Sequence, residues 1–492
     1  MAETTDPADA QSAGRREHHG RILAAGGYPS RFDRTAWAAD LHREFAGLGP
    51  GESTDQHVSV AGRVMLSRSF GKLQFATLRD LSGSIQLFVE RANLGEEAAD
   101  AFSEVDLGDW LGATGTIMTT KKGELSVKVD AFQILQKSLR PLPDKFHGLQ
   151  DIELRSRRRY LDLMVNDEAR EVAVARSRIV SNLRRQFEER GFIEVETPVL
   201  LSQATGATAR PFHTTHNALD MEMSLRIATE LHLKRLVVGG LERVFELGRI
   251  FRNEGVDSTH NPEFTMLEAY QALADYEDIM VLIEEVFASA AIAATGGTTI
   301  SHRGREIDLE PPYRRASVAV LVSDKVGRPI DLDTPRDELE SIARSAGVEL
   351  GGDASAGQIL FAIYDEVVED TIWEPTFVTH QPIDVSPLSR RNQQDPRLAD
   401  RFELVIAGSE YANAFSELND ADDQLKRFQE QASAREAGDE EAHPIDLDYV
   451  EALEYGLPPT GGLGIGVDRL VMLLTDQAHI REVILFPTLR PL

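Results

Sequence analysis

The feature that most constrains the fold is a run of five short segments rich in β-branched and aromatic residues, between residues 57 and 135. The segments are VSVAGRVML, KLQFATLRD, SIQLFVE, WLGATGTIM and LSVKVDAFQIL, and glycine or aspartate turn signals separate them. Five short strands with glycine between them are typical of a small closed barrel, and the OB-fold is the commonest barrel of this length. The sequence therefore predicts an OB-fold β-barrel over residues 56–140, after a polar leader and helical extension over residues 1–55.

A second, larger domain is expected after the segment SLRPLPDKFHG. Its two prolines indicate a linker, placed over residues 141–155. Beyond the linker, Ile179, Leu183 and Phe187 recur at the spacing of one helix face, and Gly191 stands where such a helix should stop. The larger domain therefore begins with an amphipathic helix.

Strands and helices then mix along the rest of the chain. FIEVETPVL predicts a strand that Pro198 interrupts, RVFELGRIFR and FTMLEAY predict further strands, and YEDIMVLIEEVFASAAIAA predicts a long helix. This order lacks the strict strand–helix alternation of a parallel sheet. The fold class expected of residues 156–492 is therefore α+β, an antiparallel β-sheet with flanking helices.

Composition limits the chemistry. The chain has no cysteine, which excludes disulfide scaffolds, thiol catalysis and cysteine-ligated zinc, and leaves only carboxylate or histidine metal sites. It carries 52 Lys and Arg against 81 Asp and Glu, a formal charge of −29, so a nucleic-acid partner would need a local basic patch. Two candidate patches, each with the alternative of a solvated charged face, are Lys121–Lys122 and the cluster Arg155, Arg157, Arg158 and Arg159.

No apolar stretch is long enough to span a membrane, and the first residues lack the apolar run of a secretion signal. We therefore expect a cytoplasmic protein with no membrane partner. The phosphate-loop pattern GxxxxGK[ST] and the zinc pattern HExxH are also absent. GGLGIGVDR gives GxGxG rather than GxGxxG and lies too near the C-terminus to open a βαβ unit, so a nicotinamide enzyme is not expected.

The helix predicted for VDRLVMLLT carries Arg469 in its first turn, where the helix dipole disfavours a cation. An anionic ligand that approaches the glycines before it would explain this arrangement, and a structural acid partner for Arg469 is the alternative. The period of two also places charged or polar residues on single faces of the predicted strands, in part beside apolar ones. The residues that share a face are Arg252 with Glu254; Phe264, Met266, Glu268 and Tyr270; and Asn413, Phe415 and Glu417, while Glu403 lies opposite Phe402, Leu404 and Ile406.

Each pattern alone fits a half-buried strand with one solvated side. Together they bring many acids and two arginines to one domain, as a cationic substrate, a metal and a triphosphate would require.

The same residues resemble the three signatures of class II aminoacyl-tRNA synthetases. These are the helix and strand that end at Pro198, FRNEG with HNPEFTMLE, and GLGIGVDRLVML. The stretches RPLPDKFHGLQD, RRRYLDLM, ATGATARPF, LHLKRLVVGG, EPTFVTHQPIDVSPLSRR, EYANAFSELNDADDQ and VILFPTLRP are similar to those of bacterial lysyl-tRNA synthetases, and the likeness runs from about Arg16 to Leu492. The resemblance implies a lysine–tRNA ligase that uses ATP and Mg²⁺, forms lysyl-adenylate, charges tRNA(Lys) and assembles as a homodimer.

It also implies roles at matching positions. Arg252 would bind the α-phosphate and the lysine carboxylate, and Phe264 and Arg469 would sandwich the adenine, with Arg252 and Arg469 as the catalytic residues. The rest of the implied ATP site comprises Glu254, His260, Asn261 and Glu403, and the implied Mg²⁺ ligands are Glu403 and Glu410.

The implied lysine pocket comprises Gly206, Glu230, Glu268, Tyr270, Asn413, Phe415 and Glu417. Glu230 and Glu268 would lie near the α-ammonium, and Tyr270 and Glu417 near the ε-ammonium. Such a count of acids suits a substrate whose two ammonium groups must leave water. The implied anticodon-binding residues in the barrel are Phe75, Gln86, Phe88 and Glu124, and for Phe75 the alternative is a core aromatic.

Two stretches depart from the family. LRIATELHLKR has Thr229 and His232 where the family usually has proline and an aromatic, and SFGKLQF differs beside the implied anticodon site. These differences leave open a specialised second copy of the enzyme. The competing hypotheses are a paralogue that lysylates a protein or small molecule, and a non-catalytic nucleic-acid-binding module.

Overall fold

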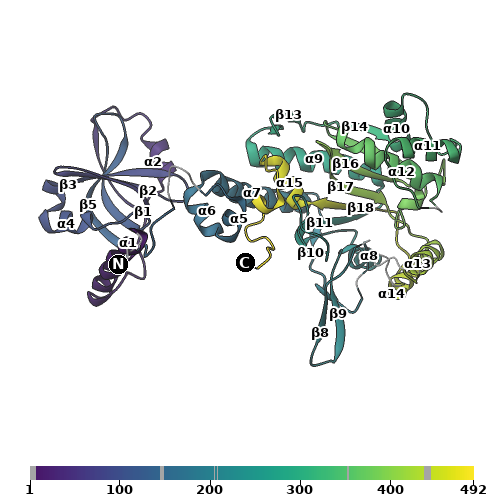
Figure 1. The fold of residues 1–492 in the computed structure, drawn as a ribbon, viewed down its shortest axis with the longest axis horizontal. Helices are drawn as coiled ribbons and strands as arrows, with labels where there is room; N and C mark the ends of the chain where they lie inside the picture. Colours follow the sequence, from purple (N-terminus) through teal and green to yellow (C-terminus); the bar gives the residue numbers. More distant parts are fainter. Residues whose placement is uncertain are drawn as a thin grey trace, which may run out of the picture. The chain divides into compact units, whose positions relative to one another are not determined.

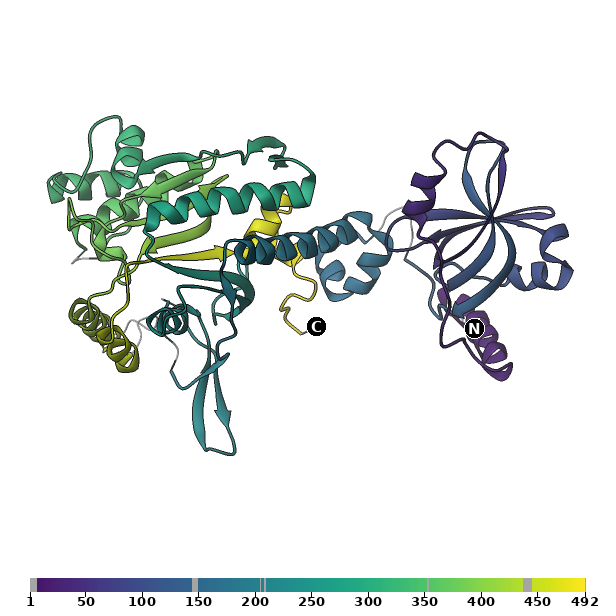
Figure 2. The same cartoon turned by 180° about the vertical axis from the view of Figure 1, so that it is seen from behind.

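The computed structural model describes residues 7–143, 149–203, 205–207, 209–351, 354–436 and 445–491. The chain divides into two compact units, Met1–Gln150 and Asp151–Leu492. The first unit holds a β-barrel and the second a large sheet with helices (Figures 1 and 2). Parts of the predicted leader and linker, residues 1–6 and 144–148, lie outside the described residues. No helix in the described parts of the chain is long and apolar enough to cross a membrane.

The first unit is a closed five-stranded barrel in the order β1-β2-β3-β5-β4, which confirms the predicted barrel. Alternate side chains of its strands, such as Leu78, Leu87 and Val127, fill the interior, so the residues between them face outward. Its elements are α1 (Pro7–Ala24), α2 (Ala38–Glu44), β1 (Ser53–Phe70), β2 (Leu73–Arg79), β3 (Ser84–Glu90), α3 (Arg91–Leu94), α4 (Glu96–Ser103), β4 (Trp110–Thr119) and β5 (Leu125–Gln136).

The second unit is built on an eight-stranded sheet in the order β14-β15-β16-β17-β18-β11-β10-β6. Its inner pairs are antiparallel, as predicted, but both edge pairs, β14 with β15 and β10 with β6, are parallel. The strands of this sheet are β6 (Ile193–Glu194), β10 (Arg243–Phe251), β11 (Glu263–Ala272), β14 (Arg314–Ser317), β15 (Thr376–Thr379), β16 (Arg401–Ile406), β17 (Ser409–Ser416) and β18 (Thr460–Gly466).

Helices and two small sheets complete this unit. The helices are α5 (Ile152–Arg157), α6 (Arg159–Val165), α7 (Asp167–Glu189), α8 (Glu230–Val238), α9 (Tyr276–Thr295), α10 (Val318–Val326), α11 (Arg336–Ser345), α12 (Ala356–Val367), α13 (Ala421–Glu436), α14 (Leu447–Glu454), α15 (Val467–Leu474) and α16 (Ile480–Val483), with 3₁₀ turns η1 (Glu369–Thr371) and η2 (Ile383–Val385). The small sheets pair β12 (Thr299–His302) with β13 (Arg305–Asp308), and β7 (Leu200–Leu201) with β9 (Met221–Leu225) and β8 (His213–His216).

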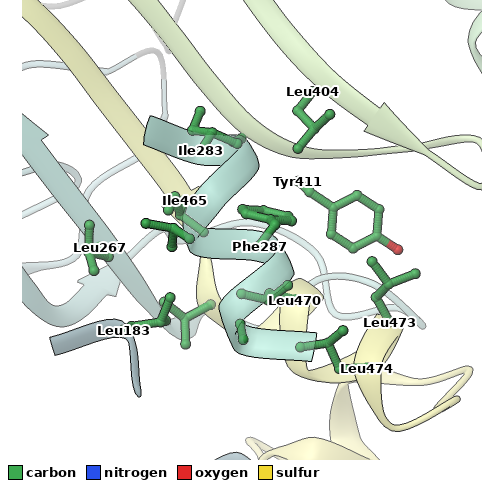
Figure 3. Close-up of a cluster of buried hydrophobic side chains, with 14 of the residues drawn as sticks. Leu183, Leu267, Ile283, Phe287, Leu404, Tyr411, Ile465, Leu470, Leu473 and Leu474 are labelled. Carbon is green, nitrogen blue, oxygen red and sulfur yellow. The ribbon is translucent and has the colours of Figure 1, made fainter. Parts of the chain in front are cut away.

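Three helices, α7, α9 and α15, cover one face of the large sheet. The predicted face of α7, with Ile179, Leu183 and Phe187, is confirmed as fully buried, and Gly191 has φ +79° just beyond the helix. Figure 3 shows Phe287 of α9 between sheet residues such as Ile465 and α15 residues such as Leu470. Because this face is apolar and covered, the polar side chains of the same strands project to the opposite face.

The strand prediction over FIEVETPVL is wrong for most of its length, since only β6 and β7 are strands there. Pro198 has no N–H to give to a ladder. Thr197 donates its N–H and its hydroxyl to a carboxylate oxygen of Glu246 instead, at 3.0 and 2.7 Å. The segment between the two short strands is therefore held by a side chain.

Three of the four arginines in the predicted candidate patch pair with nearby acids. Arg155 and Arg159 both pair with Asp162, at 2.8 and 2.5 Å, and Arg159 also donates to the carbonyl of Leu485. Arg157 pairs with Glu153. Arg155 and Arg159 therefore hold this region together, whereas Arg158 of the same cluster is exposed, as are Lys121 and Lys122 in the turn between β4 and β5.

Candidate active site

The larger of two adjoining cavities, of about 470 Å³, lies on the polar face of the sheet. Arg252 and Glu254 were expected on a strand face, but β10 ends at Phe251, so both lie in the loop that follows. The cavity brings together every residue implied for ATP, namely Arg252, Glu254, His260, Asn261, Phe264, Glu403 and Arg469, and it also takes in Glu410 and Asn413.

Two arginines line this cavity from different elements. The guanidinium of Arg252 lies 5.4 Å from the ring centroid of Phe264, a cation–π contact. Arg469 donates to the carbonyl of Glu410 at 2.9 Å and lies 3.3 Å from Nε2 of His260. Since His260 in turn contacts the Asp257 carboxylate at 2.9 Å, the side chains around Arg469 form a connected network.

Asp468 fixes the first turn of α15, which carries Arg469. Its carboxylate accepts the N–H of Thr265 in β11 at 2.7 Å and pairs with Arg176 of α7 at 2.5 Å. Arg176 also donates to the hydroxyl of Thr265 at 3.1 Å. The buried Asp468 therefore ties the helix to the sheet and to α7, and the neighbouring Arg469 projects into the cavity.

Glu403 and Glu410 face this cavity from β16 and β17. The amide of Asn413 donates to both carboxylates, at 3.3 and 3.4 Å. Burial raises the pKa of Glu403 to about 7, Arg401 opposes this rise, and the charge of Glu410 adds to it. No group of three or more His, Asp or Glu side chains that could hold a metal occurs in the described part of the chain, so a cation here would need ligands beyond these two carboxylates.

The second cavity, of about 240 Å³, shares Arg401 and Asn413 with the first. It is lined by four residues implied for lysine, Gly206, Glu230, Asn413 and Phe415. Glu268, Tyr270 and Glu417, the other three, are buried. Burial also raises the pKa of the Tyr270 phenol well above its ordinary value, so that this side chain stays neutral.

The buried ammonium of Lys234 in α8 joins several of these residues. It pairs with Glu230 at 2.5 Å and also with Glu417. Its Nζ lies 5.8 Å from the ring centroid of Tyr270 and 5.5 Å from that of Phe415. Four residues implied for the lysine pocket, from α8, β11 and the end of β17, therefore surround one charged group.

Glu268 is held by the backbone that begins α8. The N–H of Thr229 donates to both oxygens of the Glu268 carboxylate, at 3.1 and 3.3 Å. Burial raises the pKa of Glu268 to about 7, the neighbouring Glu230 adds to the rise, and the Thr229 N–H and Arg252 oppose it. Glu268 is thus poised to ionise near neutral pH.

In the barrel, Phe75 and Phe88 lie directly opposite each other on β2 and β3, on the outward side. Their ring centroids are 5.4 Å apart, and Phe70 extends the row with a centroid 6.1 Å from that of Phe75. Both Phe75 and Phe88 are only half buried, so the alternative that Phe75 is a core aromatic is wrong.

Gln86, from the same outward face, donates to the hydroxyl of Ser126 at 2.8 Å, and Ser126 donates to the carbonyl of Glu124. The four residues implied for the anticodon therefore lie on adjacent strands and the turn beside them.

Comparison with known proteins decides the family. Residues 151–490 match the family model described as tRNA synthetases class II (D, K and N), and residues 58–135 match that of an OB-fold nucleic acid binding domain. The chain belongs to the class II tRNA synthetases.

Curated relatives agree with this assignment. This class II synthetase is 50% identical over 465 residues to the lysine–tRNA ligase of Enterococcus faecalis, with 94% of this chain and 93% of the relative covered. It is 51% identical over 466 residues to the enzyme of the same name from Streptococcus mutans, with 94% of each chain covered. A lysine–tRNA ligase from a Synechococcus strain is 52% identical over 465 residues, with 94% of this chain and 93% of the relative covered.

Two charged side chains of the site, Lys234 and Arg401, are not among the residues predicted from the sequence. Arg401 pairs with Glu403 at 2.6 Å and donates to the Asn413 side-chain oxygen at 3.2 Å, so it lies between the two cavities. Arg401 could have been found because it stands two residues before Glu403 on a predicted strand, which places both on one face. Lys234 could have been found because it stands four residues after Glu230, which places both on one face of a helix.

Proposed function

We propose that this class II synthetase is a lysine–tRNA ligase that activates L-lysine with ATP and transfers it to the 3′ end of tRNA(Lys). The observation that carries the proposal is a set of three buried glutamates. Glu230 lines the smaller cavity, Glu417 pairs with the same Lys234 ammonium as Glu230, and the charge of Glu230 acts on Glu268. A substrate with two ammonium groups can leave water there because carboxylates replace its solvent.

In the first step the substrate carboxylate is already a nucleophile, so no general base is needed. It attacks the α-phosphorus of ATP, a new carboxyl–phosphate bond forms, and pyrophosphate leaves. Catalysis then depends on positioning and on charge stabilisation. We assign these tasks to Arg252 and Arg469, with Phe264 and Arg469 enclosing the adenine and with Glu254, His260 and Asn261 as further ATP contacts.

Glu403 and Glu410 are the residues we assign to Mg²⁺. Two carboxylates at a phosphate site fit this ion, because Mg²⁺ prefers oxygen ligands and is commonly held by one or two carboxylates together with substrate phosphates. The raised pKa of Glu403 also fits a site in which a cation would favour the ionised form. When bound, Mg²⁺ would neutralise charge on the phosphate oxygens.

In the second step, the terminal ribose hydroxyl of the tRNA attacks the adenylate carbonyl, which gives charged tRNA and AMP. We assign anticodon recognition to Phe75, Gln86, Phe88 and Glu124 on the barrel. Outward aromatic rings offer stacking surfaces for unpaired bases, as in other OB-folds that bind single strands.

We also propose that the enzyme is a homodimer in the cytoplasm. In support of a dimer, the segment around β6 and β7 exposes apolar side chains, with Ile193, Val199 and Leu200 each 40–50% exposed. Light scattering on the purified protein would give the mass of two chains if this is correct.

Lysine-dependent exchange of labelled pyrophosphate into ATP tests the activation step. We expect exchange with lysine but not with the other standard amino acids. Arg252→Ala should reduce exchange at least 100-fold with the fold intact, because loss of one preorganised donor costs about 3 kcal/mol or more. Wild-type exchange by this variant would contradict the assignment.

A further inference from the structure

Lys234 is fully buried, although lysine is rarely buried unless it is paired. Its ammonium contacts carboxylates from two elements, Glu230 on its own helix and Glu417 beyond the end of β17. Three aromatic rings, those of Tyr270, Phe415 and Tyr449, also lie within 5.9 Å of Nζ. This surrounding resembles the one that the proposed substrate needs for its own ε-ammonium.

The environment keeps Lys234 charged. Burial alone would lower its pKa, but the carboxylates of Glu230 and Glu417 raise it above its ordinary value. Burial raises the pKa of Glu417 well above its ordinary value and Lys234 opposes that rise, so the ammonium favours the ionised carboxylate. Lys234 thus helps to maintain the negative charge that a cationic substrate requires.

The charges can be counted. The pocket holds the carboxylates of Glu230, Glu268 and Glu417, whose ionised forms nearby cations favour, and the phenols of Tyr270 and Tyr449 stay neutral. A bound lysine brings two ammonium groups, and its carboxylate is assigned to Arg252. Two ammonium groups against three carboxylates would leave one buried negative charge without a partner, which is costly in a site closed to water. Lys234 supplies the third cation.

We propose that Lys234 is a positioning residue of the amino-acid site, a built-in ammonium that orients Glu230 and Glu417 and balances the third carboxylate when lysine is bound. This inference rests on the proposed function. Lys234 would not touch the reacting atoms, and it would act through the two glutamates. Its role would be to favour substrates with a second ammonium over apolar amino acids of the same length.

The test compares lysine with L-norleucine, which has the same carbon chain without the ε-ammonium. Binding of each is measured by competition in the pyrophosphate-exchange reaction, for the full-length wild type and for Lys234→Met, Lys234→Arg and Lys137→Met. The last variant is a matched control, because Lys137 is also fully buried and paired, with Asp106 and Asp109, but lies in the barrel. Thermal unfolding is measured for all four proteins.

We expect Lys234→Met to weaken lysine at least tenfold and norleucine less than threefold, with the KM for ATP changed less than threefold. Lys234→Arg should recover part of the preference for lysine, and Lys137→Met should keep the wild-type preference whatever its melting temperature. Equal losses for lysine, norleucine and ATP in Lys234→Met, or an unchanged preference, would overturn the proposal. If Lys234→Met does not fold, Lys234→Arg decides: a partial loss of the preference with the KM for ATP changed less than threefold supports the proposal, and an unchanged preference or an equal loss of ATP binding overturns it. Absence of lysine-dependent exchange in the wild type would instead overturn the proposed function itself.

Discussion

Glu417 has two proposed tasks. It pairs with Lys234, and it is assigned to the ε-ammonium of the substrate. Glu417→Gln keeps the size of the side chain but cannot neutralise a desolvated ammonium. Removing one partner of a buried charge pair costs about 2–5 kcal/mol, so we expect the KM for lysine to rise about 30-fold or more. The KM for ATP should change only a few fold. Steady-state exchange kinetics measure both, and equal rises would show that Glu417 is only structural.

Thr229 allows a test of whether the ionisation of Glu268 controls lysine binding, because the backbone N–H of Thr229 donates to the Glu268 carboxylate. Lysine binding needs the ionised carboxylate, whose pKa is raised to about 7. The kcat/KM for lysine should therefore fall about tenfold per unit below this pH and level off above it, until the substrate α-ammonium loses its proton. Thr229→Pro removes both the N–H and the hydroxyl, which raises the pKa further and moves the fall to higher pH, whereas Thr229→Ala loses only the hydroxyl and should move the fall less. Identical profiles for all three proteins would show that this hydrogen bond does not tune the site.

At the residue scale, the sequence could predict which side of a strand a residue lies on, but not which distant side chains it contacts. The period of two placed Glu268 and Tyr270 on one side of a strand, and Phe264 and Met266 on that same side of β11 line the larger cavity. Lys234 was not predicted as a site residue, because its contacts with Glu417 and Tyr270 join segments far apart in the sequence. No local pattern carries that information.

Strand β18 shows why a glycine-rich segment lies between the two functional strands β11 and β17. A Cβ at Gly462 would overlap a carboxylate oxygen of Glu417 and lie 2.7 Å from the ring of Tyr270. Gly462 therefore clears room for the lysine pocket. Gly464 instead lines the larger cavity, and a Cβ there would lie 3.3 Å from the tip of Met266.

We expect Gly462→Ala to raise the KM for lysine about fivefold to 150-fold, because overpacking of this kind costs about 1–3 kcal/mol. Gly464→Ala is the matched control and should affect ATP more than lysine. The two KM values in the exchange reaction separate these effects. A larger effect of Gly462→Ala on ATP than on lysine would argue against the pocket described here.

Among the elements, long periodic segments such as α7 and α9 could be predicted, whereas the order of strands could not. The helix patterns extend over many residues and need only local information. By contrast, β11 pairs with both β10 and β18, and the second partner lies about two hundred residues away. The continuous strand expected around Pro198 does not form, because the N–H of Thr197 donates to the carboxylate of Glu246 instead of to a neighbouring strand.

For the molecule as a whole, the two units should contribute separable activities. Phe75 is half buried on the outside of the barrel, so Phe75→Ala should barely shift the melting temperature. Stacking on a base contributes about 1–3 kcal/mol, which predicts about a fivefold to 150-fold loss of charging efficiency with normal pyrophosphate exchange. Leu81→Ala is a suitable control, because Leu81 is exposed in the turn between β2 and β3.

A large loss of barrel stability in Phe75→Ala would mean that the ring is needed for packing instead, since core Phe→Ala changes cost about 3–5 kcal/mol. The separation matters because the chain has a net charge of −29, so general attraction contributes little to tRNA binding. Specific stacking and a few local cations would have to hold the anticodon.

Charging of unmodified tRNA transcripts by the purified full-length protein distinguishes a tRNA ligase from a paralogue that lysylates another acceptor. With ATP and Mg²⁺ present, we expect lysine to be esterified to the tRNA(Lys) transcript and not to a transcript with a different anticodon, and we expect charging to be lost in Arg252→Ala. Lysine-dependent pyrophosphate exchange without any charging of tRNA(Lys) would contradict this account, because the enzyme would then activate lysine for a different acceptor.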